Sequence, residues 1–364
     1  MKAVFNLAVL AALASNAFAQ TFTDCNPLDK TCPSDPALGT EHEWYFNTTL
    51  DTTIWNMTTG DYTTTSDGAE FTLTKEGQST LLQSNFYIFF GVVESWVKMA
   101  KGKGIISSVV LESDDLDEID WEWVGYNTSQ VQSNFFGKGN HTTYNRGGFH
   151  AVANADTEFH NYTTYWDQNK LEWWIDGDLV RTVPYSTSST VYGKNYPQTP
   201  CQVKISNWPA GTKSADPGTV IWAGGLVDYS EAPFTMTVQK VRVQDFHTGK
   251  EYSYGDHSGS WQSIKVTPGN STALDHINNP PKSLSEKWDD LGTGAHVGVY
   301  AGAAAAGTLV FVALGLYCLR QRRKGRLEHA LDTDQDATDR NEMQNYQNSW
   351  KATEWRNSGY RPVT

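Results

Sequence analysis

Short runs of hydrophobic residues recur along the chain between residues 43 and 246, at a spacing that predicts β-strands. Clusters of Gly, Asp, Ser and Asn separate these runs, and helical periodicity is absent from this region. Residues 131–136 are predicted to form a hairpin with residues 119–124. The predicted strands are residues 43–47, 71–74, 87–97, 104–111, 119–124, 131–136, 159–166, 171–175, 179–183, 203–208, 219–223 and 235–246. Short strands at this spacing predict a single all-β sandwich in residues 20–250.

The pattern changes after residue 250. Residues 251–296 are rich in Gly, Ser, Pro and Asn, which predicts a linker or stalk. Residues 297–319 carry no charge over about the length that a helix needs to cross a bilayer. Basic residues follow at once, beginning with Arg320, and positive charge stays on the cytosolic side, so the amino-terminal part is predicted to be extracellular. Residues 320–364 are then a disordered cytosolic tail, whose polarity argues against a glycolipid-anchor signal as the alternative.

The amino terminus has the features of a secretory signal peptide. Lys2 precedes an apolar run, and Ala17-Phe18-Ala19 is a small-x-small cleavage pattern, so residues 1–19 are predicted to be removed; an uncleaved anchor is the alternative. An oxidising compartment favours a disulfide between Cys25 and Cys32, whereas Cys201 is predicted to be a buried thiol. N-glycosylation sequons, all before residue 300, occur at Asn47, Asn56, Asn127, Asn140, Asn161 and Asn270.

Composition narrows the possible partners. The net charge is −13, and Lys and Arg form no stripe in the first 290 residues, so nucleic acid is not expected as a partner. Aromatic residues make up 13% of the chain, which suits either a large aromatic core or a protein that stacks against sugar rings.

The predicted strand at residues 119–124 belongs to an unusual acidic stretch. From Asp117 to Trp123, acids alternate with apolar residues, so Glu118, Asp120 and Glu122 share one face of an extended chain. Stacked like charges destabilise an ordinary solvated strand, which indicates a functional face. Metal binding is disfavoured because the stretch lacks the glycine and spacing of a calcium loop. Glycosidic cleavage by a nucleophile and a protonated acid fits better, and no metal or cofactor is expected.

The stretch Asp117-Glu118-Ile119-Asp120-Trp121-Glu122 resembles the Glu-x-Asp-x-Glu motif of glycoside hydrolase family sixteen. Further resemblance covers residues 131–139, Phe159-His160 with Tyr162 and Trp166, and the Trp222-Ala223-Gly224-Gly225 segment, which is similar to fungal Crh-type cell-wall transglycosylases. The Cys25 to Cys32 segment is also similar to that subgroup. The resemblance implies a jelly-roll, concanavalin-like β-sandwich.

The same resemblance implies a role for each acid. Glu118 would attack the anomeric carbon, Asp120 would assist it, and Glu122 would protonate the leaving oxygen and later deprotonate the acceptor. Chitin would be the donor, with β-glucan or chitin as acceptor. Members of this subgroup usually carry a glycolipid anchor, so the predicted transmembrane helix departs from the common pattern.

Candidate sugar-binding residues surround this predicted site. Gln132 and Asn134 alternate on the neighbouring strand and can hydrogen-bond sugar hydroxyls, unless they face solvent. Trp208 and Trp222 are candidates for stacking on sugar rings, with a place in the core as the alternative. His160 and Tyr162 are further candidates, with a structural role as their alternative. The leading hypothesis is a chitin transglycosylase of the cell wall; an endo-hydrolase and a non-catalytic carbohydrate-binding receptor are the alternatives.

Overall fold

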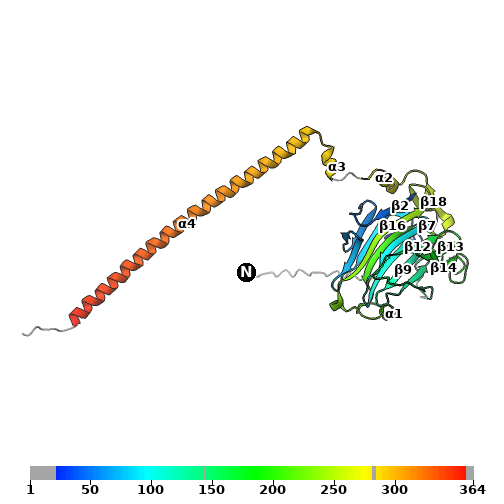
Figure 1. The fold of residues 1–364 in the computed structure, drawn as a ribbon, viewed down its shortest axis with the longest axis horizontal. Coiled ribbons are helices and arrows are strands. Elements are labelled where there is room, and N and C mark those ends of the chain that lie inside the picture. Colours follow the sequence, from blue (N-terminus) through cyan, green and yellow to red (C-terminus); the bar gives the residue numbers. More distant parts are fainter. Residues whose placement is uncertain (1–21, 141, 143–144, 281–283, 358–364) are drawn as a thin grey trace, which may run out of the picture. The chain divides into compact units, whose positions relative to one another are not determined.

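Two antiparallel sheets pack face to face, and their inner faces form the core of the molecule (Figure 1). The computed structural model describes residues 22–140, 142, 145–280 and 284–357, so the predicted signal peptide lies outside the described residues. The chain divides into two units, residues 1–281 and 282–364. The jelly-roll β-sandwich predicted from the sequence is confirmed in the first unit.

In the described chain, seven strands form the first sheet. Their spatial order is β11 (Gly148–Ala151), β10 (Gln130–Phe136), β9 (Glu118–Val124), β8 (Ile105–Ser113), β15 (Cys201–Pro209), β6 (Thr80–Ile88) and β3 (Trp55–Thr59). The predicted hairpin partner of the acidic strand is confirmed, because β10 pairs with β9 in antiparallel register.

The second sheet contains eight of the described strands. Their order is β14 (Asp178–Pro184), β13 (Lys170–Ile175), β12 (His160–Trp166), β7 (Gly91–Lys98), β16 (Phe234–Asp245), β5 (Gly68–Leu73) and β4 (Thr63–Thr65), and β2 (Glu41–Tyr45) pairs with β16. Alternation along each strand sends one set of side chains into the core. Trp121 and Trp123 of the first sheet, for example, meet Tyr162 of the second at ring-centroid distances of 5.5 and 4.6 Å.

Two strand predictions were wrong. Residues 87–97 are split between β6 and β7, because the chain turns at Phe89 and Phe90 and crosses to the other sheet. Residues 219–223 lie largely in helix α1 (Pro217–Trp222), although Thr219, Val220 and Ile221 favour strands. Capping decides the outcome: the Asp216 side chain accepts from Gly218 N, and Pro217 occupies the first turn.

The ordered unit also extends beyond the predicted boundary at residue 250. A small third sheet contains β1 (Asp35–Pro36), β17 (Glu251–Tyr254) and β18 (Ile264–Thr267). Strands β17 and β18 lie in the stretch that was expected to be a linker, and β1 pairs with β17. Tyr252 is fully buried, and its hydroxyl donates to Asp245 Oδ2 over 2.5 Å. Helices η1 (Tyr229–Glu231), η2 (Trp261–Ser263) and α2 (Thr272–Asn278) complete this unit. Burial of Tyr252 therefore ties the beginning of the expected linker to the sandwich.

The second unit is helical where it is described. It contains α3 (Leu284–Asp289) and α4 (Thr293–Asn357). By length and composition, α4 is long and apolar enough to cross a membrane. It contains the predicted span at residues 297–319. Residues 320–357 continue as helix in the structure, and their described side chains are exposed.

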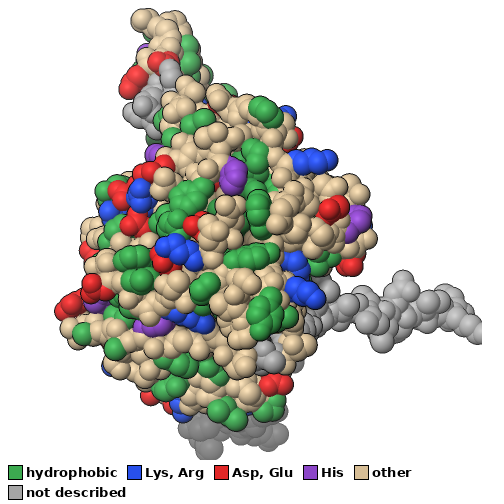
Figure 2. Space-filling model, turned by 90° about the vertical axis from the view of Figure 1, so that its right-hand side faces the viewer, with side chains coloured by type: hydrophobic (Ala, Val, Ile, Leu, Met, Phe, Trp, Pro, Cys, Tyr) green, Lys and Arg blue, Asp and Glu red, His purple; other side chains and the backbone are tan. Residues whose placement is uncertain are grey.

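The cysteines follow the predictions where the structure describes them. Cys25 and Cys32 form a disulfide with a Cα–Cα distance of 5.8 Å. Cys201 is a buried free thiol, and Cys318 is exposed. On the face shown in Figure 2, hydrophobic side chains lie in separate groups, and acidic and basic side chains are interspersed between them.

Candidate active site

Strand β9 presents its three acids on the face of the first sheet that points away from the core. Ile119, Trp121 and Trp123 are each at most 1% exposed and belong to the core cluster between the sheets. Since side chains alternate along a strand, Glu118, Asp120 and Glu122 face the opposite side. Glu118 and Asp120 are nevertheless buried, so neighbouring side chains and loops surround them, while Glu122 is half-buried.

Strand pairing supplies the nearest neighbours of each acid. On β10, Gln132 lies opposite Glu122, and Asn134 lies opposite Asp120. The predicted placement of Gln132 and Asn134 beside the acids is therefore confirmed, and both are mostly buried rather than facing solvent. On the other side, β8 places Glu112 opposite Glu118. The acids thus stand in the middle of a polar face that three strands build together.

Two buried cations lie near the acids, and the sequence analysis missed both. Lys204 Nζ is 2.5 Å from Glu112 Oε2, and β15 carries Lys204 on the same face as the acids. Arg146 is 5% exposed, and the charges of Glu118 and Asp120 oppose the lowering of its pKa by burial, which places it within their field. A lysine within the apolar run of β15 is a sequence signal for the first. Arg146 lies in a loop, where no local pattern indicates its position.

Burial and mutual repulsion raise the pKa values of Asp120 and Glu122. Burial raises the pKa of Asp120 well above its usual range, and the charges of Glu118 and Glu122 raise it further. Burial, followed by the charge of Glu118, raises the pKa of Glu122 to about 8. Glu122 is therefore mostly protonated at neutral pH, which suits a general acid. Asp120 and Glu118 are close enough for a side-chain hydrogen bond once one of them carries a proton.

Trp208 and Trp222 lie beside the far end of the acidic strand. Their ring centroids are 6.4 Å apart, and both pack against a small cluster of Ile106, Val124, Ala210 and Ala223. Trp222 Nε1 donates to Gln132 Oε1 over 2.9 Å. Both indoles are half-buried, so each combines packing against apolar residues with a remaining exposed surface at the site.

Gln132 is held from a second direction by a close backbone approach. A Cβ atom on Gly147 would lie 2.2 Å from Gln132 Nε2, so a larger residue at this position would displace the Gln132 amide. The amide next to Glu122 therefore lies between its hydrogen-bond donor Trp222 and the backbone of Gly147.

The structure does not bring His160 and Tyr162 to the acids. Both lie on β12 in the second sheet. Tyr162 is fully buried against the rings of Trp121 and Trp123, on the side of β9 opposite the acids. His160 Nδ1 lies 2.7 Å from Asp176 Oδ2, and its Nε2 lies 2.8 Å from Ala153 O. Their residue types suit sugar binding, but their sheet assignment gives them structural roles.

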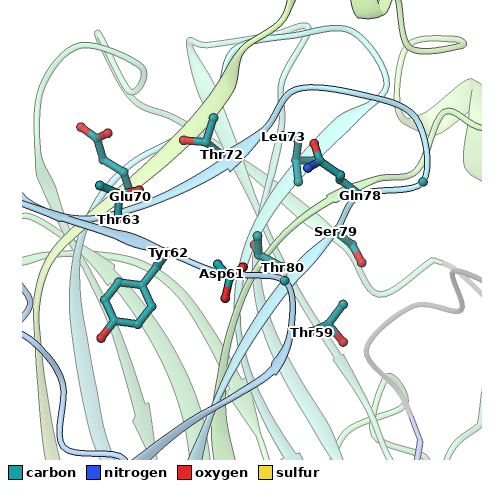
Figure 3. A pocket seen from close by; sticks show the side chains of 12 residues that line it. Thr59, Asp61, Tyr62, Thr63, Glu70, Thr72, Leu73, Gln78, Ser79 and Thr80 are labelled. Atoms are coloured by element: carbon teal, nitrogen blue, oxygen red, sulfur yellow. The ribbon is translucent and has the colours of Figure 1, made fainter. Parts of the chain in front are cut away.

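The sequons differ in their exposure. Asn47, Asn56 and Asn270 are exposed, whereas Asn127, Asn140 and Asn161 are half-buried. Among the residues that the structure describes, no group of three or more His, Cys, Asp and Glu is arranged to hold a metal ion. A hollow of about 350 Å³, rich in threonines and including Asp61 and Glu70, lies between the edges of the two sheets and contains none of the predicted site residues (Figure 3).

Comparisons with known proteins agree with this geometry. Residues 49–224 match the model of Glycosyl hydrolases family 16. The chain is 62% identical over 363 residues to "Crh-like protein 3" of Aspergillus fumigatus, covering 100% of both chains. It is 44% identical to "Crh-like protein" of Arthroderma benhamiae, covering 98% of this chain and 96% of that protein.

A solved structure, "Crh5 transglycosylase in complex with NAG", is 45% identical to the chain and superposes with a TM-score of 0.64. The match covers 66% of this chain and 99% of that one. The acidic strand, the polar face around it and these relatives lead to one assignment: the chain belongs to the Crh-like proteins of glycosyl hydrolase family 16, enzymes that act on glycosidic bonds.

Proposed function

We propose that this protein is a retaining transglycosylase that cleaves β-1,4-linked chitin chains and transfers them to β-glucan or chitin acceptors of the fungal cell wall. The observation that carries the proposal is the row of Glu118, Asp120 and Glu122 on one sheet face, with a protonated carboxyl at the Glu122 end. NAG, the ligand named for the solved Crh5 transglycosylase, is N-acetylglucosamine, the monomer of chitin.

The first half of the reaction uses both glutamates. Glu118 attacks the anomeric carbon, and a carbon–oxygen bond forms as the glycosidic bond breaks. Glu122, protonated because its pKa is raised to about 8, donates its proton to the leaving oxygen. The products are a glycosyl-enzyme ester on Glu118 and a released chain with a free hydroxyl.

Asp120 lies between Glu118 and Glu122 on the strand and affects the charge and orientation of Glu118. Its raised pKa favours the protonated form, in which the carboxyl donates a hydrogen bond to the Glu118 carboxylate. That bond orients Glu118, and the protonation of Asp120 removes one negative charge from the row. Trp173 Nε1, which donates to the Asp120 backbone carbonyl over 3.1 Å, holds this part of the strand in place.

The second half of the reaction decides between transfer and hydrolysis. Glu122, now ionised, takes a proton from a sugar hydroxyl, and that oxygen displaces Glu118 from the anomeric carbon. The acceptor sugar enters at the Glu122 end, which is bordered by Gln132, Trp208 and Trp222. Asn134, opposite Asp120, offers a further hydrogen-bonding group in the middle of the row. Stacking and hydrogen bonds there favour a sugar over water as the attacking group.

We also propose that residues 297–319 of α4 anchor the enzyme in the plasma membrane, with the sandwich outside and residues 320–364 inside the cell. The uncharged segment, the basic residues that follow it and the sequons before it support this orientation.

The experiment that tests the mechanism uses the full-length protein in detergent with chitin oligosaccharides and fluorescent β-glucan or chitin acceptors. Wild-type protein yields longer labelled products, and Glu118→Gln yields none because an amide cannot form the glycosyl-enzyme. Labelled transfer products from Glu118→Gln would refute the assignment of the nucleophile. Shortened chitin without labelled products from the wild type would indicate an endo-hydrolase instead.

A further inference from the structure

A second hollow, of about 260 Å³, lies beyond the ends of the strands. It is formed by the turn between β6 and β7, the turn between β12 and β13, the residues after β16 and the short helix η2. None of its lining residues belongs to β8, β9 or β10, the strands that carry and flank the acids. The hollow is therefore separate from the candidate active site.

The apolar side of this hollow consists of aromatic rings. Phe89 lines the hollow with 3% of its surface exposed, and His247 stacks on it with a centroid distance of 4.5 Å and an interplanar angle of 20°. Phe246 and Trp261 also line the hollow; Phe246 is 40% exposed, and Trp261 is half-buried. Tyr165 packs edge-to-face against Phe246 at 5.6 Å, which fixes the orientation of the exposed ring.

The polar side is a turn that its own hydrogen bonds make rigid. Asp167 Oδ1 accepts from Asn169 N over 2.6 Å and from Lys170 N over 2.8 Å. Asp167 Oδ2 accepts from the Tyr165 hydroxyl over 3.0 Å. The turn thereby holds the exposed amide side chains of Gln168 and Asn169 at the rim, where each offers a donor and an acceptor.

His247 adds an acceptor at a fixed position. Its Nδ1 lies 2.6 Å from Phe89 O, and a carbonyl oxygen only accepts, so Nδ1 carries the proton. In the neutral ring, Nε2 is then the acceptor. The hollow consequently combines flat apolar rings with directional hydrogen-bonding groups.

We propose that this hollow is a second carbohydrate site, which binds one pyranose ring of a β-linked polysaccharide. A pyranose has C–H faces that stack on aromatic rings and hydroxyls at its edge that pair with amides and carboxylates. The lining residues include Asp167 and no Lys or Arg, which disfavours an anionic or phosphorylated ligand. The volume is just below the range of about 300–1,000 Å³ for small-molecule pockets, so it suits a single ring rather than a longer chain.

This inference rests on the proposed function, because it takes the occupant from the polysaccharides on which the active site is proposed to act. A second site would keep the enzyme on an insoluble polymer between reactions. Its effect should appear with polymer and vanish with short soluble oligosaccharides, because a short chain bound in the hollow does not hold a second chain near the active site.

The test is a sedimentation assay with insoluble chitin and, separately, insoluble β-1,3-glucan, using full-length protein in detergent with Glu118→Gln as the parent. Phe246→Ala should weaken sedimentation about threefold to tenfold, the effect of losing one aromatic contact. The double variant Gln168→Ala/Asn169→Ala should weaken it without touching the core. Tyr192→Ala, which removes an aromatic side chain 72% exposed elsewhere, is the matched control and should leave binding unchanged.

Catalysis on soluble substrate should not depend on the hollow. In the active background, Phe246→Ala should transfer short soluble chitin oligosaccharides at the wild-type rate. Equal sedimentation of the parent, Phe246→Ala and the double variant with both polymers would overturn the proposal, and a loss with one polymer alone would identify its ligand. Residual transfer by Glu118→Gln would refute the proposed mechanism, but it would leave the sedimentation comparison valid.

Discussion

Trp222 and Gln132, which are 90 residues apart in sequence, are joined by a hydrogen bond of 2.9 Å from the indole Nε1 to the amide Oε1. Gln132 lies directly opposite Glu122 in the strand register. A short helix that follows β15 is thereby attached to the strand next to the proposed acid/base. Trp222 therefore orients the Gln132 amide that is proposed to hydrogen-bond the acceptor sugar.

Replacing Trp222 with Phe keeps an aromatic ring and removes this hydrogen bond. A hydrogen bond of this kind contributes about 1 kcal/mol, so kcat/KM for transfer should fall about fivefold. The free energy of unfolding should change little because Trp222 is half-buried. Transfer kinetics at several acceptor concentrations will show whether KM for the acceptor rises. Trp96→Phe, a substitution on the second sheet, is the control.

The raised pKa of Glu122 predicts the alkaline limit of activity. A general acid must be protonated, so kcat/KM should decline as the pH rises through about 8. The charge of Glu118 contributes to this shift, and its removal should lower the pKa of Glu122. NMR titration of the Glu122 carboxyl in wild type and in Glu118→Gln measures that change directly. An unchanged or higher pKa in Glu118→Gln would contradict the electrostatic explanation.

Asp120 should act as a hydrogen-bond donor rather than as a negative charge. Asp120→Asn keeps a donor next to Glu118, whereas Asp120→Ala leaves none. We expect Asp120→Asn to retain substantial kcat and Asp120→Ala to lose about 10²–10³-fold, the range for removing a preorganised donor. Steady-state kinetics with one chitin donor compares the two variants. If they lose the same activity, the donor role of Asp120 is wrong.

The buried pair of Glu112 and Lys204 should be important for stability as well as for the site. Burial raises the pKa of Glu112 to about 8 even though Lys204 opposes that shift. Removing Lys204 leaves the buried Glu112 carboxyl without its partner, so Lys204→Met should destabilise the sandwich by about 3 kcal/mol. The double variant Glu112→Gln/Lys204→Met should recover part of that loss. Guanidinium unfolding followed by tryptophan fluorescence measures both. Additive losses in the double variant would show that the two side chains act independently.

Buried acids outside the site make stability depend on pH. Burial, with the charges of Asp114 and Asp115, raises the pKa of Asp35 to about 8. Between its unfolded value near 4 and this folded value, the native state binds more protons than the unfolded state, so stability decreases as pH rises toward 8. The melting temperature should fall from pH 5 to pH 9, and Asp35→Asn should flatten that slope. A melting temperature that rises over this range in the wild type would contradict the prediction.

The local pattern of short hydrophobic runs and turn residues predicts most of the strands, because each segment carries that pattern by itself. It failed at residues 219–223, where β-branched residues favour a strand but Asp216 and Pro217 begin a helix. It also failed after residue 250, where Tyr252 is buried despite the polar composition around it. Local composition does not reveal a single buried side chain whose partner, Asp245, lies on another strand.

The sequence by itself determined that Glu118, Asp120 and Glu122 share one face, because the period of a strand fixes the direction of alternate side chains. Only the tertiary structure decided what surrounds that face. Lys204 and Arg146 approach the acids from distant segments, and Tyr162 is excluded because its strand belongs to the other sheet. Strand order and loop packing determine such contacts, and they depend on pairings between residues that lie far apart in the chain.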